Sequence, residues 1–303
     1  MAQENMGVQF WWFYDVIVVA LALVCIFITV KRGFIKATAT LVGYILALFL
    51  SISLSTGIAD KLADSALKGN RIKDLTFTLN ENNYAEELTG QINNLKYYAK
   101  ADYKVIQDIY STGENVDYNI YIYIRNLNNG IPDTEAEFYD KLHECYAVSA
   151  SNFIAKRLNL YTAECAAEQI KKNPTTYWEF LRLVCDVDTK QPAARFLADN
   201  YLREPTATYI RLIVFVALFV VFLLLALFIS TAFGRNDHTE KGFITVSFSI
   251  LIGAAKAAAI VVAVAAVIRL NVITGSDKML FFNHEAIDST YIFKYFYGFV
   301  KGW

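Results

Sequence analysis

The chain has 303 residues and a formal net charge of −1, from 28 basic and 29 acidic residues. With 55% hydrophobic residues it is too apolar for a disordered chain, and its neutral balance excludes the clearly basic surface of a nucleic-acid-binding domain. The apolar residues gather towards the two ends of the chain, which predicts an all-α membrane protein that carries a soluble insert.

The first apolar segment, residues 16–30, is uncharged and follows an aromatic cluster at residues 10–14 and Asp15. Aromatic residues beside an apolar run are typical of a membrane interface, so we expect a first transmembrane helix here. A secretory signal peptide is the alternative, but it needs positive charge before the apolar run. Residues 1–10 contain Glu4 and no Lys or Arg, which disfavours a signal peptide.

Three further segments are long enough to cross a membrane. Residues 37–59 and 212–234 are each 23 residues without a charge. Each would span roughly 34 Å as a helix, against a hydrocarbon core of about 30 Å. The alternative, a buried helix of a soluble protein, is seldom this long. Residues 242–268 form the fourth candidate and carry one charge, Lys256.

Basic residues in the short connections predict the orientation. The turn at residues 31–36 carries three basic residues, and the connection at 234–242 carries Arg235 and Lys241. Short basic loops face the cytoplasm, so both termini and the insert are expected outside.

The expected organisation is transmembrane helices 1 and 2 in residues 1–60, an extracytoplasmic domain in 61–204, transmembrane helices 3 and 4 in 205–270, and an amphipathic aromatic tail on the outer leaflet in 271–303. The residues expected to form the cytoplasmic basic turn are Lys31, Arg32, Gly33 and Lys36.

The insert is predicted to be mainly helical. Thr134 and Glu137 match a capping box, and the helix that they begin is expected to run to about Lys156. Asn173–Pro174, Pro192 and Pro205 are further expected helix starts, and the last leads into transmembrane helix 3. Alternating apolar residues at 75–79 and 120–124 leave a short hairpin open as an alternative.

Seven tyrosines between residues 97 and 123 are interpreted either as half-buried packing residues or as a partner-binding surface.

No sequence pattern indicates catalysis or a cofactor. The insert holds Cys145, Cys165 and Cys185, an odd number that allows at most one internal disulfide. His143 lies near Cys145, but a lone pair is weak support for a metal site. The GxSxG, HExxH, Walker A and GxGxxG motifs do not occur. We therefore expect neither an enzyme nor a bound metal or cofactor.

The candidate functional residues of the membrane segments are polar or small. Lys256 costs about 2.5–3.5 kcal/mol at the centre of a helix, so it either lines a polar path or binds an anionic lipid headgroup, or it snorkels. Snorkelling requires residues 243–251 to be interfacial or re-entrant.

Asp15 and Arg269 fall at the outer ends of helices 1 and 4 and are expected to approach one another. The small residues expected to pack closely in the bundle or at an oligomer interface are Gly253, Ala255, Ala259 and Ala263.

Residues 14–47 resemble the opening of the colicin V production protein family. The family opens with an Asp, an apolar run and a basic-Gly turn, here Asp15, Arg32, Gly33 and Phe34. Residues 242–270, with Gly253 and Lys256, are similar to its last helix, and the aromatic tail from Ser289 is also similar. The long insert departs from the shortest family members.

The resemblance implies a multi-pass protein of the bacterial inner membrane, in a family named for a role in toxin export. The expected function is a scaffold or accessory factor for export or envelope processes that acts through the extracytoplasmic domain. Its expected partners are membrane lipid and either a second copy of the chain or an envelope protein, and not nucleic acid. The alternative is an oligomeric small-solute channel or transporter that uses the fourth helix.

Overall fold

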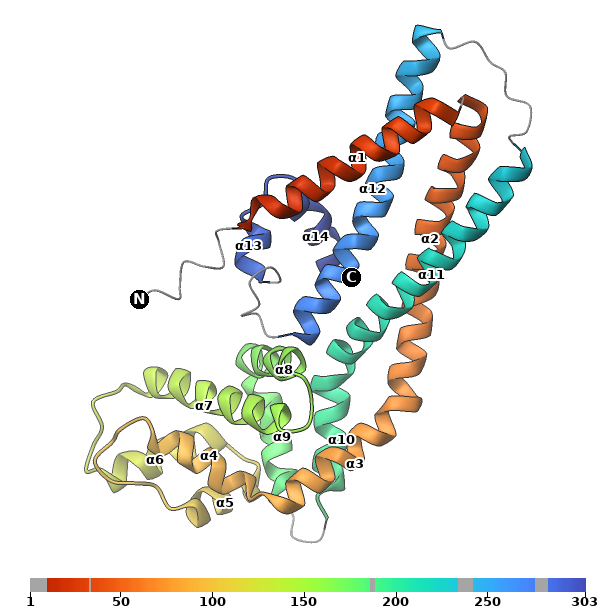
Figure 1. Ribbon diagram of the computed structural model, residues 1–303. Coiled ribbons are helices and arrows are strands. Elements are labelled where there is room, and N and C mark those ends of the chain that lie inside the picture. Colours follow the sequence, from red (N-terminus) through yellow and green to blue (C-terminus); the bar gives the residue numbers. More distant parts are fainter. Residues whose placement is uncertain (1–9, 33, 186–188, 234–241, 276–282) are drawn as a thin grey trace. The chain divides into compact units, whose positions relative to one another are not determined.

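The structure, a computed structural model, describes residues 10–32, 34–185, 189–233, 242–275 and 283–303. Every regular element in these ranges is a helix (Figure 1). The chain divides into two compact units. We call them the membrane unit (Met1–Leu62 and Ala207–Trp303) and the inserted domain (Ala63–Thr206).

In the described residues, four helices are long and apolar enough to cross a membrane. They are α1 (Trp12–Arg32), α2 (Phe34–Asp64), α11 (Arg203–Phe233) and α12 (Phe243–Thr274). The prediction of four spanning helices is confirmed at this level of length and composition. Because α12 is one continuous helix from its first residue, residues 243–251 are not re-entrant, which was one of the two arrangements that snorkelling of Lys256 would require.

The outer surfaces of these helices suit lipid rather than water. Phe49 of α2 is 65% exposed, and Leu224 and Phe228 of α11 are 61% and 78% exposed. Large exposed apolar side chains along helices of this length mark a membrane or a partner interface.

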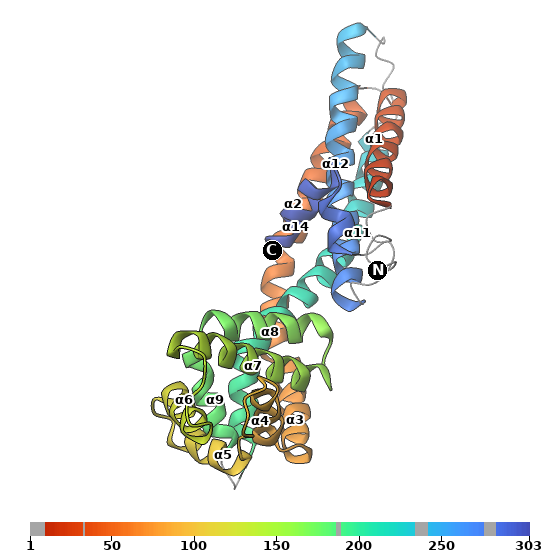
Figure 2. The same ribbon diagram turned by 90° about the vertical axis from the view of Figure 1, so that its left-hand side faces the viewer.

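Within the membrane unit, α1 runs along α12, and the two helices lie side by side in both views (Figures 1 and 2). Two short helices complete the unit, α13 (His284–Asp288) and α14 (Phe293–Lys301). Helix α14 packs against α12 and contacts α1, burying Phe293, Tyr297 and Val300. The tail is therefore part of the folded unit.

Outside residues 186–188, the inserted domain is built from eight α-helices and a π-helical turn. Their bounds are α3 (Ala66–Glu81), α4 (Tyr84–Asn93), α5 (Tyr103–Thr112), α6 (Val116–Leu127), α7 (Glu135–Ala155), α8 (Leu160–Lys172), α9 (Pro174–Val184), α10 (Gln191–Leu197) and the π-turn η2 (Ala198–Leu202). Helix α7 lies beside α8 in both views and buries one side along its length, including Phe138, Leu142, Tyr146 and Phe153. This spacing of three to four residues is that of an amphipathic helix that faces a core.

The short hairpin that the sequence left open does not form, because both alternating segments are helices in the described residues. Residues 75–79 lie in α3 and residues 120–124 lie in α6. Leu75 and Leu79 are buried, as are Ile120 and Ile124. Residues four apart share a helix face as well as a strand face, so these pairs satisfy both periods. The local pattern could not separate the two structures.

The tyrosines of the insert mostly serve packing. Tyr110 and Tyr121 are buried, whereas Tyr98 and Tyr118 are exposed and the other three are half-buried. Packing therefore accounts for five of the seven residues. The two exposed rings remain available to a partner.

Three of the predicted helix starts are confirmed. One is Pro192, the second residue of α10, which begins at Gln191. The Thr134 hydroxyl accepts the Glu137 N–H at 3.4 Å, and the Glu137 carboxylate accepts the Thr134 N–H at 2.8 Å, which completes a capping box. The helix that follows ends at Ala155, next to the expected Lys156. Helix α9 begins at Pro174, and its N-cap residue is Asn173.

Pro205 does not begin a helix, contrary to the prediction. The helical path already starts at Gln191 and continues through η2 into α11. Proline lacks the N–H that would bond the carbonyl four residues earlier, that of Tyr201, and its ring crowds that carbonyl. A widened turn immediately before Pro205 relieves this conflict without ending the helix.

Candidate functional sites

The start and end of the inserted domain are joined by charged hydrogen bonds. The Arg203 guanidinium donates to the Asp64 carboxylate through Nε and Nη2, at 2.7 and 2.8 Å. Arg71 is buried and donates to the Ala63 carbonyl at 2.6 Å and to the Leu202 carbonyl at 3.0 Å. Burial lowers the pKa of the Arg71 guanidinium, and nearby carboxylates oppose that shift. These bonds close the base of the domain.

A buried carboxylate organises the centre of three helices of the inserted domain. Asp117 of α6 is 6% exposed. It accepts hydrogen bonds from His143 Nε2 at 2.6 Å, from the Tyr146 hydroxyl at 2.9 Å and from Trp178 Nε1 at 2.9 Å. We call these four residues the Asp117 centre. A carboxylate that orients an imidazole can support general-base chemistry, but three donors are also what a buried carboxylate requires.

Sequence reasoning missed the Asp117 centre. It considered His143 with Cys145, whereas the structure places His143 against Asp117. The spacing of His143 and Tyr146 on one face of α7 was the available signal. Among the described residues no group of three or more His, Cys, Asp and Glu could hold a metal ion.

The four cysteines are free thiols, so the structure contains no internal disulfide among them. Cys145 and Cys185 are buried. Burial raises the pKa of the Cys145 thiol to about 12 and that of the Cys185 thiol to about 11. Both thiols are protonated at neutral pH and are therefore poor nucleophiles.

We expect these two thiols to react slowly, with a rate that rises with pH. In a variant in which Cys25 and Cys165 are replaced by Ser, the rate of reaction with Ellman's reagent should increase about tenfold per pH unit from pH 7 to 10, since the thiolate fraction does so below the pKa. In denaturant, where the pKa returns to its ordinary value, the rate should level off near pH 9. Fast labelling of the folded protein at pH 7 would contradict the buried thiols.

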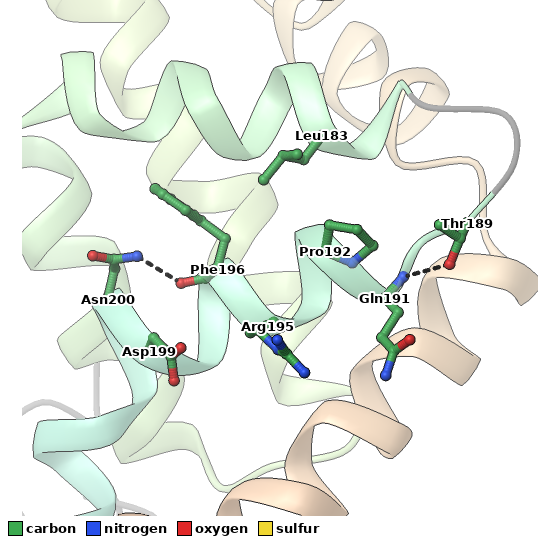
Figure 3. A pocket seen from close by; sticks show the side chains of 8 residues that line it. All are labelled: Leu183, Thr189, Gln191, Pro192, Arg195, Phe196, Asp199 and Asn200. Atoms are coloured by element: carbon green, nitrogen blue, oxygen red, sulfur yellow. Dashed lines mark hydrogen bonds between the residues drawn. The ribbon is translucent and has the colours of Figure 1, made fainter.

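The surface of the inserted domain carries a pocket of about 390 Å³ between α9, α10 and η2 (Figure 3). Its apolar lining includes Leu183 and Phe196, and its polar lining includes Arg195 and Asp199. Asp199 pairs with Lys68 at 2.7 Å. The pocket thus combines an apolar floor with a positively charged side chain at the surface.

In the membrane unit, Asp15 binds the start of α14 from another helix. Its carboxylate accepts the backbone N–H groups of Tyr291, Ile292 and Phe293 at 2.7, 3.0 and 2.9 Å. The hydroxyl of Thr290 accepts the N–H of the next residue at 2.8 Å. The first four N–H groups of a helix lack partners within the helix. For α14 these are the N–H groups of the N-cap residue Ile292 and of Phe293, which bond Asp15 of α1, that of Lys294, which bonds Thr290, and that of Tyr295, which bonds the Ile292 carbonyl at 3.2 Å. The Tyr291 N–H, which also bonds Asp15, precedes the helix.

Arg269 binds the opposite end of the same helix. It is buried, and its guanidinium donates to the carbonyl of Val300. The prediction that Asp15 and Arg269 approach one another is wrong, because no ion pair joins them in the described part of the chain. The anion binds the positive end of the α14 dipole and the cation binds its negative end, so both charges are compensated by α14. We call this arrangement the tail clamp.

The remaining predicted residues lie at the helix contacts and the basic turn. Lys256 is buried and donates to the hydroxyl of Thr40 in α2. Lys31 and Arg32 are exposed at the end of α1, and Lys36 is half-buried near the start of α2. Gly33 lies outside the described residues.

The small residues of α12 pack unequally. A Cβ atom at Gly253 would lie 2.6 Å from the Cα of Ile26, so α1 and α12 approach each other closely there. Ala259 is buried, Ala263 is half-buried and Ala255 is exposed. The close contact predicted for the fourth helix therefore occurs at Gly253 and not along the whole series.

We expect Gly253→Ala to destabilise the membrane unit by about 1–3 kcal/mol, because the methyl group would press on the backbone of α1. The matched control is Gly57→Ala, where the added methyl group would meet nothing within 4 Å. That change should stabilise α2 by about 0.5–1 kcal/mol, as Ala is the better helix former. Thermal unfolding in detergent compares the two variants, and equal shifts would rule out the close contact.

No protein-family model, characterised protein or solved structure matches this chain.

Proposed function

We propose that this protein is a multi-pass membrane scaffold, an accessory factor for export or envelope processes, whose inserted domain binds a protein partner. The observation that carries the proposal is the closed base of the domain, formed by Arg71 and by the bidentate pair of Asp64 and Arg203. A folded module with fixed ends loses little conformational freedom when a partner binds. The resemblance to the colicin V production family supports the same role.

The surface of the domain offers groups suited to a protein partner. Tyr98 is fully exposed, Tyr118 is exposed, and Arg195 lines the pocket of Figure 3. Tyrosine and arginine are enriched at the energetic centres of protein interfaces. In this proposal the protein lies in the bacterial inner membrane, with both termini and the inserted domain outside and α14 at the outer leaflet.

A loop replacement tests the scaffold. Residues 65–202 are replaced by a short Gly-Ser linker, which can join the two ends because the Asp64 and Arg203 side chains are in contact. The variant is expressed in a strain of the native host that lacks the gene, at a membrane level equal to that of the full chain. We expect it to fail to restore the phenotype that loss of the gene produces. Restoration by the linker variant would contradict the scaffold.

Restoration would instead favour the alternative, a channel or transporter assembled from several copies. The observation in favour of that alternative is Lys256, a buried charge at the contact of α12 with α2. Buried ionisable residues within spanning helices commonly mark ion or substrate pathways.

A new cysteine tests on which side of the membrane the inserted domain lies. Tyr98→Cys in a chain that lacks the native cysteines presents a thiol at a fully exposed position, whereas Cys145 and Cys185 are too buried to report. We expect a membrane-impermeant maleimide to label this thiol in cells whose outer barrier is permeable to the reagent. Labelling only after the inner membrane is opened would place the domain in the cytoplasm.

A further inference from the structure

Lys256 has fewer hydrogen-bond acceptors than its ammonium group requires. The side chain is 5% exposed, and its Nζ donates to the hydroxyl of Thr40. That hydroxyl itself donates to the carbonyl of Ala37 at 2.8 Å, so it serves Lys256 as an acceptor. An ammonium group has three donors. The described residues provide an acceptor for one of them.

Lys256 has no anionic partner in the described part of the membrane unit. Arg32, which has the same charge, ends α1, the helix that packs along α12. None of the carboxylates in the described part of the membrane unit hydrogen-bonds Lys256. They are Asp15, Asp60, Glu285 and Asp288. Asp15 is engaged at α14, and Asp60 lies 4.0 Å from Arg211. Burial of a charge without a partner is costly, so the position favours an anion from outside the chain.

The position of Lys256 in the helices sets its depth. Its partner Thr40 is six residues after Phe34, about 9 Å along α2 at 1.5 Å per residue. The basic residues Lys31, Arg32 and Lys36 flank the start of that helix. The headgroup region of a bilayer is about 5–8 Å thick on each side of the hydrocarbon core. Lys256 is thus within reach of the headgroup phosphates of lipids that surround the basic turn.

We propose that Lys256 binds a phosphate-type anion, either the phosphodiester of an anionic membrane lipid or free phosphate. Phosphate oxygens supply the acceptors that Lys256 lacks, and the anion neutralises the charge of its ammonium group. Thr40 positions the ammonium group by holding Nζ against α2. The site is independent of the scaffold role, because it lies in the membrane unit and uses no residue of the inserted domain.

The test measures lipid binding by the full chain in phosphatidylcholine nanodiscs with increasing phosphatidylglycerol. The variant is Lys256→Met, which keeps the length of the side chain and removes the charge. The control is Lys301→Met, an exposed lysine at the end of α14. We expect Lys256→Met to weaken phosphatidylglycerol binding about tenfold or more, the usual effect of losing one charged hydrogen bond, and Lys301→Met to leave it unchanged.

Inorganic phosphate separates the two sources of the anion. Competition by millimolar phosphate, with the same loss in Lys256→Met, would assign the site to free phosphate. An unchanged phosphatidylglycerol affinity in a folded Lys256→Met variant, with no phosphate binding that depends on Lys256, would overturn the proposal. If Lys256→Met fails to fold, the phosphatidylglycerol affinity is measured on Thr40→Val instead. This change removes the hydroxyl that positions the Lys256 ammonium group and leaves the charge of Lys256 in place. Phosphatidylglycerol affinity equal to wild type in Thr40→Val would then overturn the proposal.

Discussion

Replacing Asp117 by Ala should lower the free energy of unfolding of the inserted domain by about 3 kcal/mol, since one buried and two half-buried donors lose their acceptor at about 1 kcal/mol each. The donors are His143, Tyr146 and Trp178, which come from α7 and α9. Their loss leaves polar groups unpaired at the junction of three helices. Urea unfolding of the full chain in detergent, followed by tryptophan fluorescence, measures the change.

Tyr146→Phe is the matched control for this change. It removes one donor and leaves Asp117 with two, so we expect a cost of about 1 kcal/mol. A much larger cost for Asp117→Ala than for Tyr146→Phe indicates a carboxylate that stabilises the contact of three helices. Similar costs would indicate an ordinary buried polar residue. A smaller loss in Asp117→Ala than in Tyr146→Phe would mean that the centre contributes little to the fold.

The second large effect is expected in the tail clamp. Asp15→Ala removes the acceptor of three N–H groups at the start of α14, those of Tyr291, the N-cap residue Ile292 and Phe293. Loss of a helix cap costs about 0.5–2 kcal/mol, and the charge of Asp15 at the positive end of the helix dipole places this site at the upper limit, about 2 kcal/mol. The helix should detach from α1, which brief proteolysis in detergent would detect as faster cleavage within residues 283–303.

Asp15→Asn serves as the control for charge. Its side-chain carbonyl still accepts hydrogen bonds from α14, so we expect an intermediate cleavage rate. A thermal unfolding temperature of Asp15→Ala equal to that of the wild-type chain would argue against the clamp. Arg269→Met should weaken the other end of α14, because the Val300 carbonyl loses its donor.

Local and compositional features were accessible from the sequence. The uncharged segment 37–59 and the described part of 212–234, up to Phe233, lie within spanning helices because an apolar run of that length is stable as a helix in lipid whatever it packs against. The capping box at Thr134 uses residues three apart, so the sequence contains the whole interaction. The alternating residues at 75–79 and 120–124 were compatible with a strand as well as with a helix, because positions four apart lie on one face in both.

Long-range partners depended on the tertiary structure. The partners of Asp15 are backbone N–H groups more than 270 residues away, and backbone groups have no signature in the sequence. The predicted pairing with Arg269 assumed that two opposite charges at helix ends seek each other, whereas α14 lies between them and satisfies both. Lys256 likewise finds Thr40 at a separation of 216 residues.

The sequence by itself determined which segments are helices that can span a membrane and where several helices begin, because those properties depend on side-chain hydrophobicity and on neighbours within one turn. Only the tertiary structure decided which groups satisfy the buried charges of Asp117, Asp15, Arg269 and Lys256. The reason is physical: a buried charge requires hydrogen-bond partners, and the packing of distant helices alone brings those partners within 3 Å.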